Sequence, residues 1–336
     1  MFFCLSLLNK FNVKFILVIP IYDQFGLKTK ISKVISLKEK IRCKSKLFKK
    51  PPPLPRKIHT KVLGLDIDRP DETITHKIWI YWHEPTLPKI VEICIRQIER
   101  LNTEYSVVVL NKDTYKNYVG DLDLYLAKVT VTTFTDLLRL ELVSKYGGIW
   151  LDASILFFKS IDQIFSALNL NICSPILFYT DIFCKYQERP IIETWFIASP
   201  PRDPFILAWK EEFYKALNSE NPYDYYDADD EKVLIHQNLH DPKYLLAYVS
   251  AQKVLLHNNS YSLNLIRSED LGHYFFYSGE YRYDPKYVAD LLSQYKRINE
   301  SFYFVKMEGS TRNMVENYIK KGLYNKTSWV GSLIKL

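Results

Sequence analysis

Residues 133–154 of this 336-residue chain read Thr-Phe-Thr-Asp-Leu-Leu-Arg-Leu-Glu-Leu-Val-Ser-Lys-Tyr-Gly-Gly-Ile-Trp-Leu-Asp-Ala-Ser, and they decide the predicted fold. Apolar side chains recur at spacings of three and four between Phe134 and Leu142, which predicts a helix with one buried face. Gly147 is predicted to end this helix, because glycine adopts the left-handed C-terminal conformation without steric cost. The apolar run that follows predicts a buried strand with Asp152 at its end.

The start of this helix and its charged pair suggest a site. Thr133 or Thr135 is expected to cap the helix, because a threonine hydroxyl can accept a hydrogen bond from a first-turn amide. Asp136 would then lie in the first turn, near the positive end of the helix dipole, and three residues from Arg139 on one face. Ligands of open α/β sheets bind beyond the carboxyl ends of strands. The helix pair beside Asp152 therefore predicts a nucleotide-sugar and metal site.

Patterns on both sides of this stretch predict an α/β fold. A strand at 76–82, a helix at 87–101 and a strand at 106–110 form a unit of the length typical of two parallel strands joined by a helix. Residues 258–336 show little pattern apart from one strand. The other predicted elements are strands at 154–158, 191–199 and 302–306, and helices at 161–168, 203–218 and across most of 232–257.

The chain is predicted to divide into an apolar and basic N-terminal arm, residues 1–75, and a catalytic domain, residues 76–336. Residues 24–61 hold 13 lysines and arginines against one acidic residue, whereas residues 62–336 hold 30 basic and 36 acidic residues. The net charge of +7 therefore originates in the arm. A nucleic-acid-binding protein would carry its basic residues differently, so we expect no nucleic-acid partner.

The arm is predicted to attach the protein to an anionic membrane surface. Residues 2–22 are mostly apolar, but Lys10 and Lys14 interrupt them, which suits an interfacial helix or weak anchor better than a membrane span. The alternatives are an element packed on the domain and a solvated basic tail. Five cysteines without a Cys-x-x-Cys pair favour reduced thiols. We therefore expect a cytoplasmic protein, peripheral on the inner face of the cytoplasmic membrane.

The motif Asp-x-x-Arg at 136–139 and the sequence Tyr-Gly-Gly-Ile-Trp-Leu-Asp-Ala-Ser at 146–154 resemble the bacterial capsular polysaccharide synthesis proteins. These are similar to glycosyltransferase family 32 and, more distantly, to the glucosylating clostridial toxins. The resemblance covers about residues 76–310. It implies a GT-A fold with a mostly parallel central sheet, a nucleotide-sugar donor and retention of anomeric configuration. The acceptor would be a growing capsular or other surface polysaccharide, with or without a lipid link.

The resemblance also implies roles for individual residues. Asp136, Arg139 and Asp152 would be catalytic, with the first two holding the donor sugar and its phosphate; the alternative for that pair is a surface ion pair. Trp79 would stack on the nucleotide base, unless it is a core aromatic. Trp195 would stack on a sugar, and Glu193 would face the anomeric carbon. The other donor-binding residues implied are Gly147, Gly148, Trp150, Ser154 and Lys306.

Asp152 and Ser154 are the candidate metal ligands. Two carboxylates at a strand end can hold Mn²⁺ or Mg²⁺, and the cation neutralises a leaving diphosphate. Here Ser154 replaces the second carboxylate, and a hydroxyl is a weaker ligand. This replacement puts metal dependence in question and favours, as an alternative function, a non-catalytic GT-A domain that binds a glycan or a partner protein.

Other motifs carry less information. The string Asp227-Ala-Asp229 follows no apolar strand and is interpreted as an acidic loop. His236 and His240 have the spacing of a zinc protease, but Gln237 stands where the catalytic glutamate would be. The glycine-rich motifs of NAD enzymes, P-loop ATPases and α/β-hydrolases are absent from the sequence.

Overall fold

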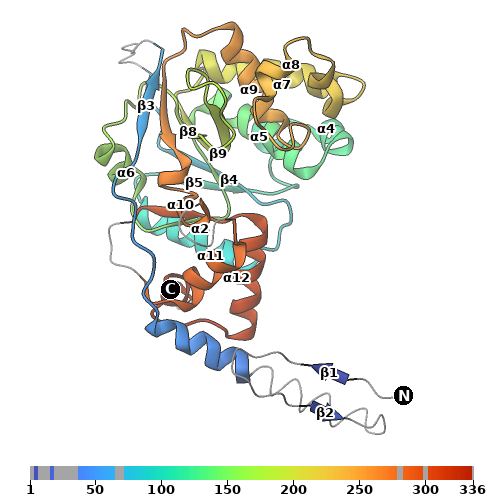
Figure 1. The fold of residues 1–336 in the computed structure, drawn as a ribbon. Helices are drawn as coiled ribbons and strands as arrows, with labels where there is room; N and C mark the ends of the chain where they lie inside the picture. Colours follow the sequence, from blue (N-terminus) through green and yellow to red (C-terminus); the bar gives the residue numbers. More distant parts are fainter. Residues whose placement is uncertain are drawn as a thin grey trace.

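The computed structural model of the protein describes residues 4–6, 16–18, 37–64, 72–277, 283–297 and 302–334. A seven-stranded sheet lies between two groups of helices (Figure 1). Its strand order is β3-β10-β8-β9-β6-β4-β5. The strands are β3 (Thr60–Leu63), β4 (Lys77–Tyr81), β5 (Ser106–Leu110), β6 (Gly148–Asp152), β8 (Ile176–Thr180), β9 (Ile191–Ser199) and β10 (Leu263–Arg267).

Most strands of this sheet point the same way. β5, β4 and β6 are parallel neighbours, and so are β8 and β10. β9 runs antiparallel to both β6 and β8, and β3 runs antiparallel to β10. The prediction of an α/β fold with a mostly parallel central sheet is therefore confirmed, including the parallel pair β4 and β5 joined by α2 (Lys89–Leu101).

Each face of the sheet has its own hydrophobic core, because successive strand side chains point to opposite faces. In β4, Ile78 and Ile80 belong to one core, while Trp79 and Tyr81 belong to the other. Figure 1 shows α5, α7 and α9 on one side and α2, α11 and α12 on the other. The principal helices besides α2 are α5 (Val131–Tyr146), α6 (Ile161–Ala167), α7 (Pro204–Asn218), α9 (Leu246–His257), α11 (Pro285–Gln294), α12 (Gly309–Lys321) and α13 (Trp329–Leu333).

Shorter elements complete the described part of the chain. A two-stranded antiparallel sheet pairs β7 (Ile155–Phe157) with β11 (Phe304–Lys306), both at predicted strands. The predicted helical region 232–257 is interrupted, because only its two ends are helical. The short helices are α3 (Lys116–Val119), α4 (Asp123–Lys128), α8 (Lys232–His236) and α10 (Tyr274–Tyr277), with 3-10 turns η1 (Lys46–Phe48), η2 (Pro222–Ala228) and η3 (Ser268–Asp270).

The N-terminal arm contributes to the folded body. β3 is an edge strand of the central sheet, so the sheet begins before residue 76, the predicted domain boundary. A helical segment at 37–45 and the η1 turn after it are fixed to the C-terminal region. The Nδ2 of Asn325 donates to the Cys43 carbonyl at 3.0 Å, and Lys46 pairs with Asp290 of α11.

The apolar stretch 2–22 lies mostly outside the described residues. Only β1 (Cys4–Ser6) and β2 (Ile16–Val18) are described there, and they pair with each other in antiparallel fashion. Among helices in the described ranges, none combines the length and the apolar character needed to cross a bilayer.

Candidate active site

Helix α5 presents Asp136 and Arg139 to the end of β6. Thr130 caps this helix, with its side chain accepting from the Thr133 amide, so the expectation that Thr133 or Thr135 is the cap is wrong. The helix begins earlier because Thr130 is the residue with extended dihedrals. Asp136 consequently lies beyond the first turn, and Arg139, not the helix dipole, balances its charge.

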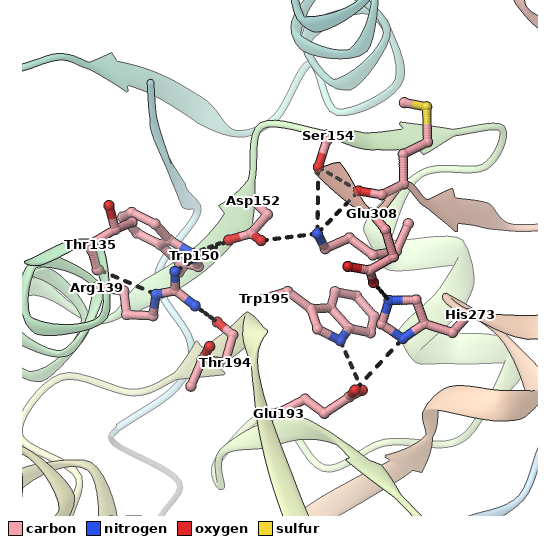
Figure 2. Close-up of polar contacts among 12 residues, drawn as sticks. Thr135, Arg139, Trp150, Asp152, Ser154, Glu193, Thr194, Trp195, His273 and Glu308 are labelled. Atoms are coloured by element: carbon pink, nitrogen blue, oxygen red, sulfur yellow. Dashed lines mark hydrogen bonds and ion pairs between the residues drawn. The ribbon is translucent and has the colours of Figure 1, made fainter. Parts of the chain in front are cut away.

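Arg139 is buried and joins α5, β6 and β9 at the site (Figure 2). Its Nη1 lies 3.2 Å from Oδ1 of Asp136 and donates to the Thr194 carbonyl at 2.6 Å. Its Nη2 lies 3.4 Å from Oδ1 of Asp152, and its guanidinium lies 5.0 Å from the centre of the Trp150 ring. Asp136 and Arg139 are 5% and 4% exposed, so their contact is not a surface ion pair.

Asp152, at the end of β6, is shared between two cations. Besides Arg139, the Nζ of Lys306 lies 3.1 Å from its Oδ2, and the Trp150 indole donates to its Oδ1 at 3.2 Å. Burial disfavours ionisation of Asp152, but Lys306 and Arg139 outweigh it and hold the pKa of this carboxyl below its usual value. Asp152 is therefore a carboxylate at neutral pH, with 26% of its side chain exposed to the cavity.

A second charged chain leads from Lys306 along the same wall. Glu308 lies 2.7 Å from Nε2 of His273, and Nδ1 of His273 lies 3.6 Å from Glu193. Burial lowers the pKa of His273, but the two glutamates outweigh it and raise the pKa above its ordinary value. For Glu308, burial acts against ionisation, while His273 and Lys306 bring its pKa to about 2. The carboxyl groups of Glu193 and Glu308 therefore favour the protonated form of His273, which lies between them.

A bulge in β9 places Glu193, Thr194 and Trp195 in the site. Leu177 of β8 pairs with Ile197, whereas the next residue, Phe178, pairs with Glu193. The intervening residues of β9 therefore have no partner on β8, and such bulges re-aim side chains. The Trp195 indole donates to Glu193 at 2.8 Å, and its ring lies against Gly272, where an added Cβ would be 2.6 Å from the ring.

Two cavities meet at Asp152, at the carboxyl ends of β4 and β6. The larger, about 610 Å³, extends along β9 and has a wall of aromatic side chains. The smaller, about 400 Å³, reaches the residues that follow β4. Residues that line both are Thr132, Arg139, Asp152, Tyr244, Lys306, Glu308 and Gly309.

Four predicted donor residues, Trp79, Gly147, Gly148 and Trp150, do not line these cavities. Trp79 is fully buried, and its indole donates to the Gly147 carbonyl at 3.0 Å, so the structure assigns it to the core. Gly147 and Gly148 have φ of +64° and +91°. A Cβ added at Gly147 would lie 2.7 Å from Pro201, and one added at Gly148 would lie 2.5 Å from the Lys77 carbonyl. These glycines form the helix-to-strand turn. Trp150 is also fully buried and acts on the site through Asp152 and Arg139.

Several residues of the site escaped the sequence analysis. Trp82 follows β4 directly and lines the smaller cavity, with the Arg312 guanidinium 4.9 Å from its ring centre. Its position after a predicted strand was an available signal. His273, Glu308 and Arg312 come from the region without pattern, and no local signal marks them.

The residues present do not fit a divalent-metal site. Across the ranges that the structure describes, no group of three or more His, Cys, Asp or Glu side chains is arranged to hold a metal ion. Asp152 is bound by Lys306 and Arg139, and the Ser154 hydroxyl donates to the Met307 carbonyl at 3.0 Å. The string Asp227-Ala-Asp229 lies on η2 and the following turn and lines neither cavity. A role for Mn²⁺ or Mg²⁺ stays a prediction.

The sequence model of the family described as "Capsular polysaccharide synthesis protein" matches residues 35–321. The chain belongs to this family. This membership confirms the resemblance seen in residues 136–154.

Individual proteins are more distant. The O-glycosyltransferase braB of Annulohypoxylon truncatum is 27% identical over 162 residues, which cover 43% of this chain and 38% of that protein. The chain thus spans about two fifths of that relative's length. Among solved structures, the PaToxG glycosyltransferase is similar with a TM-score of 0.34 and 13% identity, covering 69% of this chain and 84% of that one. A glycosyltransferase involved in glycosylation of the major capsid of PBCV-1 has a TM-score of 0.40 and 11% identity, covering 73% and 98%.

Burial of Asp136 predicts a pH-dependent stability. Burial raises the pKa of Asp136 to about 6, despite the opposing effect of Arg139. Between about pH 4 and 6 the folded protein then holds a proton that the unfolded chain releases, so folding stability falls as the pH rises. Between pH 4 and 7 we expect the free energy of unfolding of the wild type to fall by up to about 3 kcal/mol relative to that of Asp136→Asn. Urea unfolding over this range measures the difference. Asp113→Asn, at an exposed position, should follow the wild type; a constant gap between wild type and Asp136→Asn would contradict the prediction.

Proposed function

We propose that the protein is a glycosyltransferase that moves a sugar from a nucleotide-sugar donor to a saccharide acceptor of a capsular or other surface polysaccharide. The observation that carries this proposal is the pair of cavities that meet at Asp152 beyond the carboxyl ends of β4 and β6. Ligands of such sheets bind at this edge. Family membership and the name of the fungal relative support the same class of reaction.

The smaller cavity suits the nucleotide and diphosphate of the donor. Trp82 offers an aromatic ring beside the Arg312 guanidinium, and bases stack on such surfaces. Lys306 and Arg312 supply positive charge next to Asp152, which suits phosphate oxygens. Arg139 has most of its donors bound to protein atoms, so its main role here is to position Asp152.

The larger cavity suits a saccharide acceptor. Tyr244, Tyr248, Phe276 and Tyr277 line it together with Trp195, and aromatic faces pack against the apolar faces of sugar rings. Glu193 and His273 at its wall can hydrogen-bond sugar hydroxyls. Most of the aromatic wall therefore belongs to the larger cavity and Arg312 to the smaller one, with Asp152 and Lys306 at their junction.

The reaction we propose retains the anomeric configuration. The bond between the anomeric carbon and the diphosphate oxygen breaks, and its electron pair goes to that oxygen. The acceptor oxygen attacks from the same face, and its proton passes to the departing diphosphate. The protein then needs no separate general base; it positions the reactants and stabilises the developing charge.

A screen of nucleotide sugars tests this function. The full-length protein is incubated with UDP-, GDP-, dTDP- and CMP-sugars, and thermal stability and release of free nucleotide are measured. We expect one nucleotide class to raise the melting temperature and to be hydrolysed slowly. The alternative function, a non-catalytic glycan- or partner-binding domain, is favoured by Ser154 in place of a second carboxylate. Absence of any shift, with or without Mn²⁺, would support that alternative.

We also propose that the segment at 37–50 binds an anionic membrane surface on the cytoplasmic face. Leu37, Ile41 and Phe48 are 59%, 60% and 90% exposed, although the same segment is fixed to the domain through Cys43 and Lys46. Exposed basic side chains surround the three apolar ones, and each basic residue near an anionic surface contributes about 1 kcal/mol. The exposed basic residues are Lys38, Lys40, Arg42, Lys44, Lys49 and Lys50.

Replacing these apolar side chains should release the protein from membranes. The triple variant Leu37→Gln, Ile41→Gln and Phe48→Gln is expected to bind phosphatidylglycerol-containing vesicles at least about tenfold more weakly, because it removes the apolar area that would enter the interface. Vesicle co-sedimentation measures the partition. Val233→Gln, which replaces an exposed apolar residue elsewhere, should bind as the wild type does. Equal binding by the triple variant would rule out this segment. Substitution is preferred to deletion of the arm, since deletion would remove part of β3.

A further inference from the structure

The ammonium group of Lys306 lies where the predicted metal ion would lie. Its Nζ is 3.1 Å from Oδ2 of Asp152 and 3.4 Å from Oγ of Ser154, the two residues predicted to ligate Mn²⁺ or Mg²⁺. It is also 3.3 Å from the Met307 carbonyl. A lysine ammonium has three donors, and these three oxygen atoms match them in number.

The backbone on both sides holds this lysine in place. Lys306 lies opposite Ile155 in the β7–β11 pair, and its amide donates to the Gly272 carbonyl at 2.8 Å. The Met307 amide donates to the Ser154 carbonyl at 3.0 Å, and the Ser154 hydroxyl returns a bond to the Met307 carbonyl. The Lys306 side chain is 9% exposed. The carboxylate of Asp152 provides the opposite charge that this buried ammonium needs.

Further positive charge lies on the same side of the cavity. Arg312 lines the smaller cavity from the first turns of α12. Glu308, at the N-cap of α12, makes no side-chain capping bond and pairs with His273 instead. The first-turn amides of α12 therefore lack a side-chain acceptor, and Gly309 at this end lines both cavities. A dication placed beside Asp152 would therefore also lie near the positive charges of Lys306, Arg139 and Arg312.

We propose that Lys306, together with Arg312, replaces the divalent cation, so that nucleoside diphosphate binding and sugar transfer proceed without metal. This inference rests on the proposed glycosyltransferase function. When the bond from the anomeric carbon to the diphosphate oxygen breaks, the electron pair moves to that oxygen. The Lys306 ammonium keeps its proton and neutralises the new charge, while the acceptor proton goes to the diphosphate. Asp152 orients the ammonium toward the leaving group.

Binding of nucleoside diphosphates with and without metal tests this inference. The full-length protein is titrated calorimetrically with UDP, GDP and dTDP, once in excess EDTA and once with Mn²⁺. For the nucleotide that binds, we expect dissociation constants that agree within about twofold between the two conditions. Lys306→Ala should bind at least about tenfold more weakly in EDTA, because a charge-assisted contact is lost. Mn²⁺ should restore part of that loss in Lys306→Ala alone, since Asp152 is then free to accept a cation.

Two further variants control the experiment. Lys306→Arg keeps the charge and should retain more affinity than Lys306→Ala. Lys320→Ala removes an exposed lysine on α12 and should bind as the wild type does. Wild-type binding that requires Mn²⁺ would overturn the inference and leave the proposed function standing. Absence of nucleotide binding in both conditions would overturn both. The wild-type comparison does not depend on whether any variant folds.

Discussion

Asp152→Asn is expected to lower the rate of sugar transfer by about 10²–10³-fold while leaving the fold intact. The amide keeps the size of the side chain but removes the charge that lies between Arg139 and Lys306. The Lys306 ammonium would lose its strongest partner and its defined position at the junction of the two cavities. The rate is measured as kcat and as kcat/KM with the donor identified by the nucleotide screen, and circular dichroism checks the fold.

A comparison with Ser154→Ala distinguishes the effect of the Asp152 charge from that of the neighbouring Ser154 hydroxyl. Ser154→Ala removes one contact to Lys306 and one bond to the Met307 carbonyl, so we expect a loss below about tenfold. Asp113→Asn, an exposed substitution of the same type, should leave the rate unchanged. A near-wild-type rate for Asp152→Asn would remove Asp152 from the mechanism.

Arg139→Met is expected to destabilise the protein by about 3–5 kcal/mol, because it leaves a buried carboxylate uncompensated. The side chain pairs with Asp136 and Asp152 and donates to the carbonyls of Thr135 and Thr194. Methionine fills similar volume but can satisfy none of these oxygen atoms. Unfolding in urea at neutral pH measures the loss.

Two comparisons give this prediction its controls. Arg139→Lys keeps the charge but loses the planar fork, so its stability should lie between wild type and Arg139→Met. Arg202→Met replaces an arginine whose side chain is 73% exposed and should change stability by less than about 0.5 kcal/mol. A loss below about 1 kcal/mol for Arg139→Met would show that the buried carboxylates take up protons or water without penalty.

The local sequence pattern was sufficient to predict the central helices and strands of the fold. The helix, the Gly147 turn and the strand that ends at Asp152 all lie where the sequence placed them, as do β4, α2, β5 and β9. Apolar periodicity and glycine conformation are short-range properties, so one segment contains the information. The pairing of Asp136 with Arg139 follows for the same reason, because three residues along a helix bring two side chains together.

The sequence pattern did not predict which of several residues of the same type would reach the site or cap the helix. Trp79 and Trp82 both belong to the first predicted strand, yet Trp79 faces the core and Trp82 lines a cavity. Strand alternation fixes the relative orientation of neighbours, but it does not state which face a later helix will cover. The helix cap is Thr130 and not Thr133 or Thr135, because four threonines within residues 130–135 offer similar hydroxyls.

The sequence by itself determined the α/β class, the strand-end carboxylate and the Asp136–Arg139 pair, since each depends on residues close together in the chain. Only the tertiary structure decided what surrounds Asp152. Lys306 reaches it through the β7–β11 pairing, and Glu308 and His273 extend the charged wall from the C-terminal region. Lys306 lies more than a hundred positions from Asp152 in the chain, and no periodicity encodes this contact. Long-range strand pairing therefore placed an ammonium group, and not a second carboxylate, beside the predicted donor site.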